Sequence, residues 1–227
     1  LRPGGMIRAG LCLYGRRGGR MTWPRSFGVR LDDSRWGAGL QHRFRKGFVY
    51  ADARVDDARL VVLTAMSARA HGADVRVRTR FVAPRREGGL WRATIAGPGG
   101  REDVAARAIV NAAGPWVADV LATTDATPSG ARVRHVKGSH IVVPRVHDEE
   151  HAYILQNSDN RIVFVIPYQE RGSLIGTTDV PVGEDDAPRI SDDDTDYLIA
   201  LANAYLEKPI SRADVAWSYS GVRPLYD

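Results

Sequence analysis

Two residues capable of proton and charge chemistry lie three positions apart near the middle of the chain. Lys137 supplies a cation, and His140 supplies an imidazole that titrates near neutral pH. Gly138 and Ser139 between them predict a flexible turn at the mouth of a buried strand, because an apolar run follows directly. Polar groups are costly to hold near a core, so the placement indicates a function. A strand that begins at a solvated turn would also explain it.

A second candidate is Arg223, which stands between Gly221 and Pro224 at the end of a strand that contains Trp217 and Tyr219. A guanidinium in this setting is held more rigidly than one on a surface loop. Its five N–H donors suit two-point contact with a carboxylate or a phosphate. A structural salt bridge accounts for the same arginine equally well.

Other catalytic patterns are weak or missing in the sequence. His147 and His151 have the i, i+4 spacing of a zinc helix, but they flank acidic residues in a polar loop, so we expect a solvated turn and no metal. Ser139 precedes His140, yet neighbouring strand residues face opposite sides, and no G-x-S-x-G is present. There is no Walker sequence and no complete G-x-G-x-x-G. If the protein binds a nucleotide cofactor, we therefore expect the glycine-rich turn that contacts its phosphates to lie outside this segment.

Helices and strands must position these residues. Asp56 and Asp57, ahead of an apolar run, predict a helix over 58–70, and Ser191, ahead of three Asp residues, predicts another through Leu206. The first 14 residues favour a short amphipathic helix, and residues 15–47 favour loops. Strands are predicted over 75–79, 90–95, 105–112, 132–137, 140–143, 152–156, 161–168, 173–178 and 214–220. Turn residues between several of the later strands suggest an antiparallel meander.

The strand over 105–112 runs into the small residues Asn111, Ala112, Ala113 and Gly114. Small residues at a strand end let a ligand approach the backbone closely. A tight turn from strand to helix explains the same sequence without a ligand.

Composition sets broader limits. The chain has 227 residues, of which 44% are hydrophobic, enough for one large domain or two small ones with a real core. No apolar run reaches the length of a membrane-spanning helix, and the single cysteine, Cys12, favours a reducing compartment. The chain begins with Leu1 and stops directly after a predicted strand, so we expect it to be a segment of a longer protein.

The net charge of +5 is concentrated at the start, where the first fifty residues hold eleven Lys or Arg and two Asp. Such a basic region could contact an anionic membrane or a nucleic acid, or be a solvated surface. Aromatic residues do not alternate with these cations as a stacking platform for single strands requires, so we expect no nucleic acid partner.

Seven segments, in order, resemble the FAD-dependent, quinone-linked glycerol-3-phosphate dehydrogenases of the aerobic type. They are LRPGGMIRAGLCLYGRRGGR, FVYADARVDDARLVVL, RAIVNAAGPWV, VRHVKGSHIVVPRVH, AYILQNSDNRIVFVIPY, LIGTTDV and WSYSGVRPLYD. The resemblance covers most of the chain. It implies an α+β fold in which parts of an α/β FAD-binding core, of the D-amino-acid-oxidase-like class, are joined to an antiparallel-sheet substrate domain.

The resemblance also implies roles for individual residues. Asn111, Ala112, Ala113 and Gly114 would lie along the FAD, and Lys137 and His140 would face the flavin and the substrate. His140 would accept the hydroxyl proton. Arg223 would bind the substrate phosphate, with Thr178 near the same face. The resemblance thus implies that the protein oxidises sn-glycerol 3-phosphate to dihydroxyacetone phosphate. In that reaction a hydride passes to FAD, and the electrons are then passed to quinone.

The expected organisation has three parts. Residues 1–47 form a basic segment in contact with a membrane, 48–125 form part of the FAD-binding domain, and 126–227 form the substrate-binding domain. The family is peripheral on the cytoplasmic face of the cell membrane, and a homodimer is compatible with it. The segment alone is expected to be inactive, because the glycine-rich FAD fingerprint is missing.

Two alternatives stay open. One is a related flavin oxidase that uses oxygen, or an enzyme that acts on another alcohol or amine. The other is a basic membrane- or nucleic-acid-binding module without catalysis.

Overall fold

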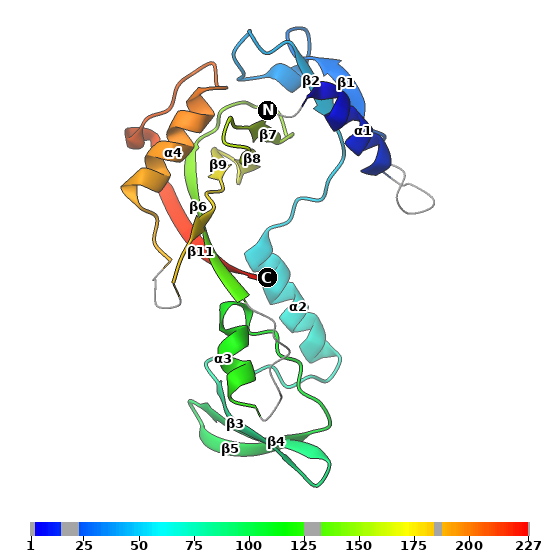
Figure 1. The fold of residues 1–227 in the computed structure, drawn as a ribbon, viewed down its shortest axis with the longest axis vertical. Coiled ribbons are helices and arrows are strands. Elements are labelled where there is room, and N and C mark those ends of the chain that lie inside the picture. The colour runs from blue at the N-terminus through cyan, green and yellow to red at the C-terminus, as the bar shows by residue number, and fades with distance from the viewer. Residues whose placement is uncertain (1–2, 15–22, 125–132, 184–187, 227) are drawn as a thin grey trace. The chain divides into compact units, whose positions relative to one another are not determined.

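The computed structural model describes residues 3–14, 23–124, 133–183 and 188–226 (Figure 1). The helices are α1 (Gly4–Tyr14), η1 (Arg35–Gly37), α2 (Asp57–Ala70), η2 (Gly114–Trp116), α3 (Val117–Ala122), α4 (Asp192–Asn203) and η3 (Arg212–Asp214). The strands are β1 (Phe27–Arg30), β2 (Lys46–Val49), β3 (Arg80–Glu87), β4 (Leu90–Gly97), β5 (Gly100–Ala106), β6 (Val133–Pro144), β7 (Tyr153–Gln156), β8 (Ile162–Tyr168), β9 (Gly172–Gly176), β10 (Val180–Pro181) and β11 (Trp217–Tyr226). Among these residues no helix has both the length and the apolar character needed to span a membrane.

The chain divides into two compact units, which are described separately. The first combines residues 1–52 with 135–223, and the second combines 53–134 with 224–227. The candidate residues Lys137, His140, Thr178 and Arg223 all belong to the first unit. The turn from Asn111 to Gly114 belongs to the second.

The first unit is built on an antiparallel sheet in the order β10-β6-β9-β8-β7, and β11 also pairs with β6. Helix α4 lies against one face of this sheet (Figure 1). The core forms where alternate strand residues meet the apolar face of the helix. It comprises Leu40, Ile141, Val143, Tyr153, Leu155, Val163, Val165, Ile175, Leu198, Leu201, Ala202 and Leu206.

Both long helices begin as their sequences predict. The Asp56 side chain accepts a hydrogen bond from the Arg59 amide at 3.0 Å and caps α2. Ser191 and Asp194 form a reciprocal capping box at the start of α4. Helix α4 ends at Asn203, three residues before the predicted end, and the Asn203 side chain bonds the backbone of Ile210 beyond the helix.

The second unit contains a three-stranded antiparallel sheet in the order β3-β4-β5 and the helices α2 and α3. Gly88 and Gly89, with φ of 60° and 79°, make the predicted tight turn between β3 and β4. The predicted strand over 75–79 is wrong, since no described strand pairs with it and Arg78 has φ of 55°, outside the extended region.

The predicted strand over 105–112 is also wrong beyond Ala106, where β5 ends. A strand exists only where a neighbour takes its backbone hydrogen bonds, and within the described residues none pairs with 107–113. The loops predicted over 15–47 are partly wrong too, because β1 pairs with β2 and Leu40 packs into the core. Residues 15–22 lie outside the described part.

The turn predicted at Gly138 and Ser139 is wrong, because β6 runs through both residues without a break. The Ser139 amide donates to the Thr178 hydroxyl at 2.9 Å, and the Ser139 carbonyl accepts from the Thr178 amide at 3.3 Å. Both backbone groups of Ser139 are therefore hydrogen-bonded to Thr178, as the backbone of a paired strand would be. The architecture as a whole confirms the predicted mixture of helices with an antiparallel sheet.

Candidate active site

His140 lies on the face of β6 that points away from the core cluster, and its ring is held from two sides. The imidazole stacks on the Tyr219 ring of β11, with centroids 4.8 Å apart and planes 9° from parallel. In the neighbouring strand β9, the residue directly opposite His140 is Gly176. A Cβ at Gly176 would come within 2.1 Å of the His140 Cδ2 atom, so only glycine leaves room for the ring.

Arg223 lies on the same side of β11 as Tyr219, since side chains two and four residues apart in a strand share a face. Its Nη2 atom donates to the Thr178 carbonyl at 3.2 Å and to Asp179 Oδ1 at 3.0 Å. Both Arg223 and Asp179 are about half exposed, with side-chain values of 47% and 57%. The guanidinium is thus aimed by two contacts and stays accessible.

Because Gly138 has no side chain, Thr177 and Arg223 can lie close to the backbone of β6. A Cβ there would lie 2.5 Å from the Thr177 hydroxyl oxygen and 3.2 Å from Arg223 Nη2. The Gly138 position, two residues before His140, therefore faces the guanidinium. The imidazole and the guanidinium share one face of the β6–β11 pair, and we call this face the reaction face.

Lys137 lies on the opposite face of β6. Its Nζ atom contacts Asp194 Oδ2 at 2.7 Å and donates to the Arg189 carbonyl at 3.1 Å. The side chains of Lys137 and Asp194 are only 12% and 6% exposed. The structure therefore does not bring Lys137 to the reaction face beside His140, because odd and even residues of a strand point to opposite sides.

Asp194 collects several donors. Besides Lys137, it accepts from the Ser139 hydroxyl at 3.1 Å and from the Ser191 amide at 3.1 Å. Burial raises the pKa of this carboxyl, but the hydrogen bond from Lys137 and those from Ser191 and Ser139 outweigh burial, so its pKa is lowered. The Ser139 hydroxyl also meets the Ser220 hydroxyl at 2.9 Å, which links α4, β6 and β11.

Thr178 is buried, with 1% of its surface exposed. Its hydroxyl accepts the Ser139 amide, while its carbonyl accepts from Arg223. The predicted substrate-binding residue therefore contacts Arg223 through its backbone. Reasoning from sequence missed Asp179 and Asp194 as partners of the two cations, because each partner is more than forty residues away. Only the helix-capping pattern pointed to Asp194.

The turn from Asn111 to Gly114 lies in the second unit. The Asn111 side chain donates to the Val117 carbonyl at 2.9 Å and accepts the Ala113 amide at 3.3 Å, which closes the turn on itself. Gly114 has φ of 58°, and within the described segments a Cβ there would meet nothing within 4 Å. Small residues in a fixed, open turn fit the close approach of a dinucleotide such as FAD.

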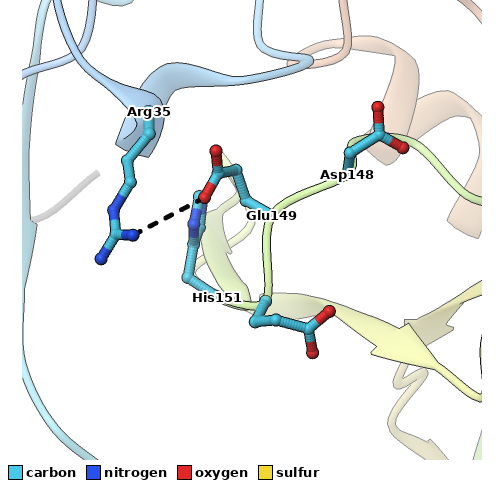
Figure 2. A pocket seen from close by; sticks show the side chains of 5 residues that line it. Arg35, Asp148, Glu149 and His151 are labelled. Carbon is cyan, nitrogen blue, oxygen red and sulfur yellow. Dashed lines mark ion pairs between the residues drawn. The ribbon is translucent and has the colours of Figure 1, made fainter.

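A pocket of about 190 Å³ lies away from the reaction face and is lined by Arg35, Asp148, Glu149, Glu150 and His151. In Figure 2 the side chains of Arg35 and Glu149 point toward each other and form an ion pair of 3.9 Å, while Asp148 points elsewhere.

The solvated turn predicted around His147 and His151 is wrong, since His147 is 8% exposed and its ring stacks on His151. Burial, with His147 and Arg35 nearby, lowers the pKa of His151 to about 4. Within the described residues, no group of three potential metal ligands occurs.

Comparison with known proteins gives the family. Residues 15–227 match the FAD dependent oxidoreductase (DAO) family. Glycerol-3-phosphate dehydrogenase of Pseudomonas aeruginosa is 48% identical over all of this chain, and D-erythritol 1-phosphate dehydrogenase of Brucella abortus is 42% identical over all of it. The chain spans only 44% and 46% of the lengths of these two relatives.

Among solved structures, glycerol-3-phosphate dehydrogenase from Bacillus halodurans complexed with FAD aligns with a TM-score of 0.73 and 29% identity. The alignment covers 83% of this chain and 39% of that one. The similarity therefore extends from the sequence to the fold. This chain belongs to the FAD-dependent oxidoreductase family.

Proposed function

We propose that this chain is the substrate-handling part of a flavoprotein that oxidises sn-glycerol 3-phosphate to dihydroxyacetone phosphate, with FAD as hydride acceptor. The observation that carries the proposal is the reaction face, where a held imidazole and an accessible guanidinium share one side of β6 and β11. The 48% identity with glycerol-3-phosphate dehydrogenase of Pseudomonas aeruginosa supports this substrate.

The residues match the needs of the reaction. Oxidation of a secondary alcohol removes a hydride from carbon, which the bound flavin accepts, and a proton from the hydroxyl oxygen. The His140 imidazole is the acceptor for that proton. A phosphate dianion needs a fixed cation. Within the described residues the hydrogen bonds of Arg223 use only Nη2, which leaves its Nε and Nη1 donors for the phosphate.

The remaining predicted residues take supporting roles in this proposal. Thr178 aims Arg223 through its carbonyl, and Asn111 to Gly114 lie along the FAD. Lys137 supports β6 from behind through Asp194 and does not touch the substrate.

The phosphate role of Arg223 is tested in the full-length flavoprotein with Arg223→Ala. Loss of charged hydrogen bonds predicts an apparent affinity for glycerol 3-phosphate about thirtyfold weaker or worse, because each such bond contributes about 2 kcal/mol. Glycerol, which has no phosphate, should react at its former low rate. Equal losses for the two alcohols would remove Arg223 from the phosphate site.

The proton role of His140 is tested in the same protein by stopped-flow reduction of the flavin at saturating glycerol 3-phosphate. His140→Ala should slow this step by about 100-fold or more, the usual contribution of a positioned general base. An unchanged single-turnover rate would exclude His140 as the base.

We further propose that the electrons pass to quinone at the cytoplasmic face of the cell membrane. Helix α1 supports membrane contact, because Met6, Leu13 and Tyr14 are 62%, 67% and 53% exposed beside a basic sequence. Replacing Met6 and Leu13 by Ser should reduce binding to anionic vesicles, measured by co-sedimentation. The same changes should not alter flavin reduction, and unchanged vesicle binding would refute contact through α1.

A further inference from the structure

Gly221 occupies a distinctive position on the reaction face. On β11 it stands two residues after Tyr219, which stacks on His140, and two residues before Arg223. Side chains alternate along a strand, so all three positions share one side, and Gly221 lies about 6.6 Å along the strand from each neighbour. The position between Tyr219, on which His140 stacks, and Arg223 therefore carries no side chain.

The described part of the chain does not require glycine at this position. Among the described residues a Cβ at Gly221 would meet nothing within 4 Å, and the φ of Gly221 is not in the left-handed region. Gly138 and Gly176 differ, because a Cβ at either would approach Thr177 Oγ1 or His140 Cδ2 to 2.5 and 2.1 Å. Glycine inside a strand lowers stability and often marks the close approach of a ligand.

We propose that Gly221 is a specificity-determining residue, over which the carbon chain of a short polyol monophosphate lies between His140 and Arg223. The inference rests on the proposed function, since it assigns the alcohol end to His140 and the phosphate end to Arg223. Because Gly221 has no side chain, the space above it decides how bulky a carbon chain can lie between His140 and Arg223. The relative named D-erythritol 1-phosphate dehydrogenase, 42% identical, shows that the family includes a protein named for a four-carbon substrate.

The test uses the full-length flavoprotein with Gly221→Ala and Gly221→Val. One added methyl group in a substrate site changes kcat/KM by about tenfold or more, so the KM for glycerol 3-phosphate should rise by about tenfold in Gly221→Ala and further in Gly221→Val. Inorganic phosphate, as a competitive inhibitor, reports on Arg223 alone. Its inhibition constant should stay unchanged in Gly221→Ala, as should the FAD content, and the melting temperature should not fall.

Gly138→Ala is the matched control. Its Cβ would crowd Thr177 and Arg223, so this variant should lower the melting temperature and weaken phosphate inhibition together. A KM unchanged in both Gly221 variants would overturn the inference. Loss of FAD content or of phosphate inhibition in Gly221→Ala would also overturn it, because it would show that glycine serves packing. Failure of the proposed function has a different signature, namely no flavin reduction by glycerol 3-phosphate in the unmodified protein.

Discussion

The individual residues of this site divide into two chemical environments on the two faces of β6. His140 stacks on Tyr219 on the reaction face, while Lys137 is enclosed with Asp194, Ser139 and Ser220 on the other. A buried ion pair is weak evidence for stability as such, yet removing one partner leaves a buried charge without compensation. Lys137 is thus a residue whose main effect is expected on folding.

Lys137→Met should therefore lower the free energy of unfolding by about 3 kcal/mol, because it leaves the Asp194 carboxylate without its cation. Urea denaturation measures this loss. Arg212→Met is the matched control, since the pair of Arg212 with Asp196 is 50% and 59% exposed, and its removal should cost less than about 1 kcal/mol. Equal costs in the two variants would contradict the assignment of Lys137 to a buried structural pair.

Residue types alone predicted only part of this arrangement. The sequence singled out His140 and Arg223 by residue type, and the structure brings both to the reaction face, while their roles stay predictions. The separation of Lys137 from His140 follows from strand alternation, but the mistaken turn at Gly138 hid it. Two long-range partners, Asp179 for Arg223 and Asp194 for Lys137, depend on which strands and helices meet, and local sequence carries no such information.

At the scale of elements, local signals located the helices better than the strands. A helix satisfies its own backbone, so the caps at Asp56 and Ser191 marked where α2 and α4 begin. A strand depends on its neighbours, and the apolar residues before Asn111 form none because, in the part of the chain described, no strand pairs with them. Gly138 gave the most misleading signal. It allows close packing inside β6, where the sequence predicted a flexible turn.

The whole molecule shows an unequal distribution of its core. The core cluster lies entirely in the first unit, whereas Ala93 is the buried hydrophobic residue found in the described part of the second. Helix α2 has no buried residue, and Leu60, Val61, Val62, Leu63 and Met66 are all 48% to 68% exposed. Helices of this length derive most of their stability from packing an apolar face.

The 227-residue chain on its own should therefore open in α2 long before it opens in β6. In hydrogen exchange followed by mass spectrometry, we expect the amides of α2 to exchange with little protection, because the described parts of the chain bury none of its residues. The amides of β6 from Ile141 to Val143 should exchange most slowly, since their side chains are at most 8% exposed and their strand is paired on both sides. In the full-length flavoprotein the α2 amides should become protected if other parts of the enzyme cover the helix. Protection of α2 equal to that of β6 in the isolated chain would show that the second unit is stable without such cover.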